Sequence, residues 1–207
     1  MSQNLTLKLK KLRKELEKEK KKKIILKSAL YLFSKKGFYN TKMDEIADRA
    51  LISKGLLYFY FDSKEKILEE IINLIYKDFI PKLESILKLK LSPLEKLKKF
   101  IKFEFDFYKK NKKFVKLIYE IFQEEVYFLK RKFPFFREIH LKEKEILKRI
   151  IEDGIKEGIF KKIELEFACF LLSSIFHYIF LKGAVLKDYR KITEIFLKGI
   201  LKDEKDC

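Results

Sequence analysis

Residues that build metal sites, disulfide frameworks and phosphate-binding loops are scarce in this sequence. Its 207 residues include two cysteines, two histidines, six glycines and three prolines. Cys169 and Cys207 cannot form a disulfide framework, and no CxxC spacing or Cys/His cluster suggests a metal. There is no glycine-rich phosphate loop, and both histidines lie far from any plausible nucleophile motif. We therefore expect no metal, no cofactor and no catalytic residues.

Long apolar runs are missing as well. The longest, from Phe167 to Leu181, has 15 residues and is interrupted by two serines and a histidine. A helix needs about 20 apolar residues to cross a bilayer. The N-terminus also lacks the apolar core of a signal peptide. With no disulfide framework, the sequence predicts a cytoplasmic protein that has no membrane partner.

Positive charge, by contrast, is abundant. The formal net charge is +18. Residues 1–64 carry 17 Lys/Arg against 7 Asp/Glu, whereas the other 143 residues carry 32 against 24. The basic surplus is therefore densest in the first third of the chain, where it would serve phosphate neutralisation. Lysine runs are also common on solvated surfaces, so the charge alone does not identify a partner.

The patterning is helical almost throughout. No strand-like alternation or hairpin dipeptide occurs, which predicts an all-α fold of about nine helices. Residues 1–22 have leucines at helical spacing, and they could extend the first helix as a basic arm or fray; we favour a partly ordered helix. Two short helices are expected between residues 41 and 61. The other expected helices span residues 23–36, 63–80, 92–110, 112–130, 135–156, 164–182 and 188–202.

The two short helices form a motif with a tight turn. Thr41 and Asp44 have the spacing of a capping box, and Ser53 is a good N-cap for the second helix. Leu57 and Phe61 are four residues apart and can both face inward, which leaves neighbouring aromatic residues outside. The second helix would be roughly 10 Å long. Such a helix suits end-on presentation in the major groove of DNA.

Residues 23–68 resemble the DNA-binding domain of the TetR family of bacterial and archaeal transcription regulators. The positions that agree in register are Ala29, Leu32, Phe33, Gly37, Phe38, Thr41, Ile46, Ala47, Ser53, Lys54, Gly55, Leu57, Tyr58, Tyr60, Phe61, Ser63, Lys64, Glu65 and Leu68. The resemblance implies an N-terminal three-helix helix-turn-helix domain (residues 23–68) after a basic helical extension (residues 1–22). It also implies a larger C-terminal helical domain for effector binding and dimerisation (residues 69–207).

Three positions depart from the family pattern. Leu51 stands at the turn position where the family usually has glycine, and a left-handed conformation there would cost about 1 kcal/mol. Leu56 and Phe59 replace a common threonine and a common histidine in the recognition helix. Both changes remove hydrogen-bonding groups from the DNA face. They suggest apolar contacts, for instance to thymine methyl groups.

Ten residues are expected to contact DNA from their positions in this motif. The phosphate contacts are expected from Thr41, Lys42, Tyr58, Tyr60 and Lys64. The residues that approach bases are expected to be Ser53, Lys54, Gly55, Leu56 and Phe59. Lys64 also begins a helix, where backbone amides favour a phosphate.

The C-terminal helices suggest dimerisation. Residues 164–182 are apolar nearly all round, which is more than one packed face requires. A central core helix would explain the same pattern. In the TetR family the last two long helices pair with those of a second subunit. The resemblance therefore implies a homodimer through residues 164–182 and 188–202, bound to a palindromic operator in double-stranded DNA.

The helices between residues 94 and 136 are rich in aromatic residues. Family members often enclose an effector there, although aromatic residues at helical spacing are more often core than pocket. The expected ligand-binding residues are Phe103, Phe107, Tyr108, Tyr119, Phe122, His177 and Tyr178. The composition favours a small apolar or amphipathic effector, such as a fatty acyl compound or a lipophilic aromatic.

The sequence thus predicts an effector-responsive DNA-binding regulator, most simply a repressor released from a palindromic operator, and no enzyme activity. Two alternatives fit the same composition. One is a basic helical protein that only coats nucleic acid. The other is a peripheral membrane protein that uses the basic N-terminal helix.

Overall fold

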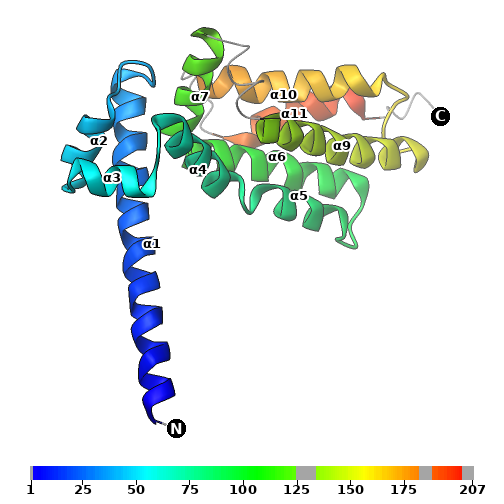
Figure 1. Cartoon of the computed structure of the whole chain (residues 1–207). Helices are drawn as coiled ribbons and strands as arrows, with labels where there is room; N and C mark the ends of the chain where they lie inside the picture. Colours follow the sequence, from blue (N-terminus) through cyan, green and yellow to red (C-terminus); the bar gives the residue numbers. More distant parts are fainter. Residues whose placement is uncertain (1, 125–133, 182–187, 202–207) are drawn as a thin grey trace. The chain divides into compact units, whose positions relative to one another are not determined.

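A computed structural model describes residues 2–124, 134–181 and 188–201, with side chains described for residues 5–121, 137–176 and 188–201 (Figure 1). Within these ranges the regular elements are helices, and one isolated β-bridge joins Phe160 to Leu201. The all-α prediction is confirmed. The chain forms two compact units, residues 1–74 and residues 75–207. Among the described residues, no helix is long and apolar enough to cross a membrane.

The first unit contains helices α1 (Ser2–Lys36), α2 (Met43–Ala50), α3 (Lys54–Tyr60) and most of α4 (Lys64–Tyr76). Helix α2 packs against both α1 and α3. The core of the unit consists of fully buried apolar side chains from all four helices: Ile25, Ala29, Phe33, Ile46, Ala47, Leu57, Ile67 and Leu68. These residues fix the orientation of α3, because its single buried residue anchors one face and leaves the other exposed.

Helix α1 combines the domain helix expected at residues 23–36 with the helical extension that we favoured for residues 1–22. It begins at Ser2 and continues without interruption to Lys36. The side chains of residues 5–21 are exposed, including the leucines at positions 5, 9, 12 and 16. Gly37 ends the helix at a φ of 86°, and its amide donates to the Phe33 carbonyl at 2.9 Å. The expected role of Gly37 as the glycine that terminates this helix is confirmed.

The second unit contains α5 (Phe79–Leu87), α6 (Pro93–Lys110), α7 (Lys112–Glu124), α9 (Pro134–Lys156), α10 (Leu165–Leu181) and α11 (Tyr189–Ile200). Helix α6 is central, because it packs against each of the other five. Helix α9 also contacts α5 and α10. The start signal at Ser92 is confirmed: its hydroxyl accepts from the Glu95 amide at 3.3 Å, and the Glu95 carboxylate accepts from the Ser92 amide at 3.2 Å.

One expected helix is divided. A single helix was expected over residues 63–80, ending or kinking near Pro81, but α4 ends at Tyr76 and α5 begins at Phe79. Pro81 lies in the first turn of α5 and terminates nothing. A proline is tolerated there because the amides of the first turn have no intrahelical acceptor.

The end of α9 depends on two glycines. Gly158 has a φ of 71°, and the Ile159 amide reaches back to the Gly154 carbonyl at 2.9 Å, as in a Schellman motif. The chain then returns so closely that a Cβ atom on Gly154 would lie 2.1 Å from Cδ2 of Phe160. Phe160 is buried at this point. Gly154 therefore permits the close approach that packs Phe160 on the helix.

Candidate nucleic-acid interface

The N-terminus of α2 is capped differently from the sequence prediction. The expected capping box between Thr41 and Asp44 is wrong, because α2 begins one residue later, with Lys42 as the N-cap. The Glu45 carboxylate, not that of Asp44, reaches back to accept from the Lys42 amide at 3.0 Å. The same carboxylate pairs with Lys36 on α1, and this hydrogen bond is the main cause that lowers the pKa of Glu45.

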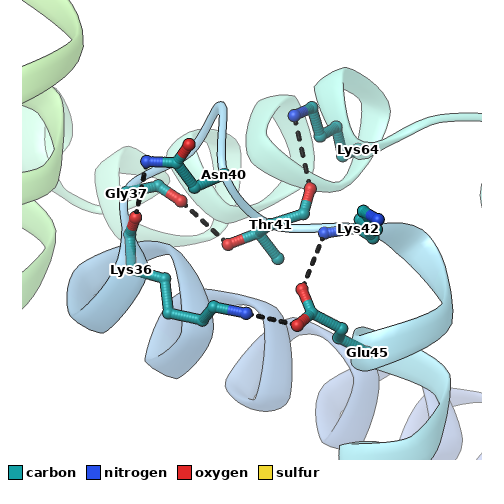
Figure 2. A network of polar contacts seen from close by, with 7 residues as sticks. All are labelled: Lys36, Gly37, Asn40, Thr41, Lys42, Glu45 and Lys64. Atoms are coloured by element: carbon teal, nitrogen blue, oxygen red, sulfur yellow. Dashed lines mark hydrogen bonds and ion pairs between the residues drawn. The ribbon is translucent and has the colours of Figure 1, made fainter.

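A network of polar contacts holds the loop between α1 and α2 (Figure 2). The Thr41 hydroxyl donates to the Gly37 carbonyl at 2.8 Å, and the Asn40 side-chain amide donates to the Lys36 carbonyl at 3.2 Å. Thr41 is only 1% exposed. Its hydroxyl is thus used inside the unit, and its side chain presents almost no surface to a phosphate.

Lys64, at the start of α4, joins the same network. Its ammonium group donates to the carbonyls of Phe38, Tyr39 and Thr41 at 3.0, 2.9 and 3.3 Å. The nitrogen also lies 4.8 Å from the Phe38 ring centroid. An ammonium group has three N–H donors, so the three carbonyls satisfy all of them. We call this arrangement the loop brace: Thr41 and Lys64 with the carbonyls of residues 37, 38, 39 and 41.

The turn between α2 and α3 adopts the left-handed conformation that the sequence analysis considered for Leu51. Leu51 has φ 55° and ψ 45°, in the left-handed region. The Leu51 amide donates to the Asp48 carbonyl and the Ile52 amide to the Ala47 carbonyl, both at 3.1 Å. This is a Schellman motif with leucine where glycine is usual. The Leu51 side chain is 91% exposed, so packing gives little compensation for the backbone strain.

Helix α3 has one buried face and one exposed face. The Ser53 hydroxyl accepts from the Leu56 amide at 3.2 Å, which confirms the predicted N-cap. Leu57 and Phe61 are buried, as expected. Ser53, Lys54, Gly55, Tyr58 and Phe59 are exposed, whereas Leu56 and Tyr60 are half-buried. Phe59 is 73% exposed, and its ring makes an edge contact with Tyr60 at a centroid distance of 5.6 Å.

Lys54, expected to approach a base, already has a partner on the neighbouring helix. Its ammonium group lies 2.6 Å from Oδ2 of Asp44 on α2. This hydrogen bond is the main cause that raises the pKa of Lys54. The Lys54 side chain is 62% exposed and that of Asp44 is 50% exposed, so the pair is accessible to solvent. Lys54 must leave Asp44, or share it, to contact a base edge.

The predicted ligand-binding residues lie in the second unit. Tyr108 is buried on α6, Phe103 and Phe107 are half-buried on the same helix, and Tyr119 is half-buried on α7. The side chains of Phe122, His177 and Tyr178 lie outside the described residues. Phe107 packs on Phe79 with a centroid distance of 4.4 Å, and Tyr108 stacks on Phe176 of α10 at 5.9 Å. Phe103 also packs on Phe79, with a centroid distance of 5.4 Å, so three of the predicted residues contribute to one aromatic cluster.

Two acidic residues of the second unit, the body of the protein, were not predicted from the sequence. Glu104 on α6 and Glu143 on α9 are both buried. Glu104 falls on the apolar stripe of α6 that contains Phe100, Ile101, Phe105 and Tyr108. A lone carboxylate on an otherwise apolar helical face was the available signal.

Known proteins resemble this chain at two levels. The sequence model described as "Bacterial regulatory proteins, tetR family" matches residues 25–71. An uncharacterized HTH-type transcriptional regulator, YuxN of Bacillus subtilis (strain 168), is 45% identical over 58 residues. That match covers 28% of this chain and 20% of YuxN. The similarity to this curated relative is therefore confined to a fraction of its length.

Solved structures extend the likeness to most of the chain. The ketosteroid transcriptional regulator KstR2 of Mycobacterium tuberculosis superposes with a TM-score of 0.74 at 21% identity, covering 88% of this chain and 95% of KstR2. A candidate regulator of fatty acid metabolism from Clostridium perfringens gives a TM-score of 0.70 at 27% identity, covering 87% of this chain and 100% of that protein. With the helix-turn-helix geometry, the matched segment identifies residues 25–71 as a DNA-binding domain of the TetR family, and the rest of the chain shares the fold of these solved regulators.

Proposed function

We propose that the protein is a homodimeric repressor that binds a palindromic operator and releases it when a small molecule enters the body. The observation that carries this proposal is the exposed face of α3. That face presents Ser53, Lys54 and Phe59 to solvent, while Leu57 anchors the opposite face in the core. A short helix held in this way can offer its N-terminal residues to base edges in the major groove.

The expected DNA contacts divide into two groups under this proposal. Lys42, Tyr58 and Tyr60 would contact phosphates, and Ser53, Lys54, Gly55, Leu56 and Phe59 would approach bases. Thr41 and Lys64 would act differently from the sequence expectation, because their donors are used within the loop brace. We assign them the role of fixing the loop that presents Lys42 and the start of α2.

The proposed dimer would use the exposed faces of α10 and α11. Large apolar side chains are exposed there in the single chain: Phe167, Phe170 and Leu171 on α10, and Ile195 on α11. Phe170 alone is 65% exposed. Exposed apolar residues clustered on two helices are typical of an interface with another protein chain. A second copy would pair these faces about a two-fold axis and place two recognition helices roughly 34–36 Å apart.

The proposed release depends on the body. A ligand can shift the protein away from DNA only if it binds the released conformation more tightly than the DNA-bound one. The aromatic cluster formed by Phe79, Phe107, Tyr108 and Phe176 supports a ligand with apolar surface. The structural likeness to a candidate regulator of fatty acid metabolism supports only the apolar part of such a ligand and not its head group.

Selection of bound sequences from random double-stranded DNA tests the core of this proposal. A repressor should enrich one palindrome, and fluorescence anisotropy should then show much tighter binding to it than to a scrambled duplex. Lys42→Ala should weaken binding and reduce the salt dependence by about one counterion. Lys116→Ala, which removes an exposed lysine from α7, is the matched control and should leave both quantities unchanged.

The two alternatives predict different results. A protein that only coats nucleic acid would enrich no sequence in the selection. A peripheral membrane protein would float with anionic liposomes through its basic N-terminal helix, and deletion of residues 2–20 would abolish flotation. Enrichment of a palindrome without flotation would exclude both readings.

A further inference from the structure

The body of the protein contains a carboxyl group that has no hydrogen-bond partner among the described residues. Glu104, in the middle of α6, is only 1% exposed. Neither of its carboxylate oxygens has a hydrogen-bond partner within the described structure. Burial of an unpaired carboxylate is costly, and most buried polar groups in native proteins are hydrogen-bonded. An unsatisfied carboxyl at this depth therefore calls for a physical explanation.

Among the described residues, the surroundings of Glu104 supply more negative charge and no lysine or arginine partner. Helix α6 packs against α9, which carries Glu143, itself only 7% exposed. Burial, followed by the negative charge of Glu143, raises the pKa of Glu104 well above its usual range. Glu143 has His140 as a neighbour, with Nδ1 3.3 Å from Oε2. Within the described residues, no lysine or arginine forms an ion pair with either glutamate.

Aromatic rings occupy the same part of the body. Tyr108 follows Glu104 by one helical turn and therefore lies on the same face of α6. Its ring stacks on Phe176 of α10 with an interplanar angle of 11°. Tyr76 packs on Phe107, with the ring centroids 5.2 Å apart. Burial and the two glutamates raise the pKa of both tyrosines. The carboxyl groups thus lie among neutral aromatic side chains.

An unpaired carboxyl of this kind does not serve stability. An apolar residue of similar size would fill the position on α6 without the desolvation cost of a carboxylate. Proteins commonly lose some stability where a site is preformed for a ligand. Among the described residues, Glu104 lacks a positively charged partner, and aromatic rings pack in the same part of the body.

We propose that the body binds a lipophilic cation: an apolar or aromatic frame that carries one protonated amine, held by Glu104 and Glu143. This inference rests on the proposed function only in taking the ligand to be the effector. The ammonium group would donate a hydrogen bond to the Glu104 carboxylate. The faces of the Tyr108 and Phe107 rings would attract the same cation through cation–π contacts. A fatty acid would add a further acidic group beside Glu104 and Glu143 and would supply no positive charge, so the inference narrows the amphipathic class to its cationic members.

Three probes that share one alkyl chain and differ in their head group test which head group the site prefers. Dodecylamine, dodecanol and dodecanoate would each be titrated into the full-length protein below their micelle concentrations, by calorimetry and thermal shift. The amine should bind at least tenfold more tightly than the alcohol, and the carboxylate should bind least. Equal binding of all three, or tightest binding of dodecanoate, would overturn the inference.

Two variants of one residue separate a ligand site from a structural role. Glu104→Gln should abolish the preference for the amine over the alcohol while leaving dodecanol binding unchanged. Glu104→Leu should raise the melting temperature of the free protein and also lose the preference. Asp106→Asn, an exposed position on the same helix that pairs with Lys102, is the control and should change neither. A free protein destabilised by both Glu104 variants, with the amine preference retained, would make Glu104 structural and refute the site.

Operator binding distinguishes failure of this inference from failure of the proposed function. If the amine binds through Glu104 but the selected DNA remains bound, the cation site stands and the coupling to DNA is wrong. If dodecanoate releases the DNA and Glu104→Gln has no effect, the repressor stands and the cation site is wrong.

Discussion

Replacing Leu51 by glycine should stabilise the protein. A left-handed conformation costs an L-amino acid about 1–2 kcal/mol, and Leu51 has a φ of 55°. Glycine removes this strain but loses more backbone entropy on folding, by roughly 0.5–1 kcal/mol. The Leu51 side chain is almost fully exposed, so its removal forfeits little packing. The net gain in the free energy of unfolding should be about 0.5–1 kcal/mol.

Chemical denaturation of the full chain, followed by circular dichroism, measures this change. The midpoint in urea should rise for Leu51→Gly with an unchanged slope, and the melting temperature should rise by roughly 1–4 °C. Leu51→Ala keeps the strain and removes only exposed atoms, so its midpoint should match the parent protein. A gain for Leu51→Ala equal to that for Leu51→Gly would show that the leucine side chain, not the backbone, is responsible.

The same motif elsewhere in the chain provides the reverse test. Gly158 ends α9 with a φ of 71°, and a Cβ atom there would meet no heavy atom within 4 Å. Gly158→Ala should therefore destabilise the protein by about 1 kcal/mol through backbone strain alone. If neither Gly158→Ala nor Leu51→Gly changed the unfolding midpoint, the cost assigned to the left-handed turn would be wrong.

Three further outcomes follow from contacts in the two units. Asp44→Asn should free Lys54 and remove a negative charge from the DNA face, so operator affinity measured by anisotropy should rise severalfold; an unchanged affinity would mean that Lys54 makes no DNA contact. Gly154→Ala should destabilise the protein by about 2–3 kcal/mol, because the new Cβ would displace the buried Phe160 ring; denaturant unfolding would measure the loss. Phe170→Glu should convert a dimer into monomers in analytical ultracentrifugation, and a variant that stays dimeric would place the interface on another surface.

Signals that act within one helical turn were predictable from the sequence. Ser53 and Ser92 cap their helices as expected, because an N-cap bonds to an amide only three residues away. Gly37 ends α1 for a similarly local reason, since a left-handed residue there favours glycine. The all-α class follows from the same kind of information, namely helical periodicity and the absence of strand patterns.

Contacts between distant residues were not predictable. The Thr41 capping box failed because its hydroxyl bonds backward to Gly37, leaving Glu45 to satisfy the Lys42 amide. The phosphate role expected for Lys64 took no account of three carbonyls that lie 23 to 26 positions away in the chain. Glu104 was visible as a lone acid on an apolar stripe, but only the packed body shows that its oxygens have no partner among the described residues.

The loop brace has a consequence for how the protein opens. Lys64 joins the end of α4 nearest the motif to the carbonyls of residues 38, 39 and 41, so residues 42–63 form a loop closed at its base. Closing this loop costs conformational entropy, and that cost applies to the whole segment and not to each helix separately. Helices α2 and α3 should therefore detach and reform together rather than fray separately. In hydrogen exchange, the amides of α2 and α3 would then report a single opening event. The free energy of that event would determine the fraction of time that the recognition helix spends detached from the unit.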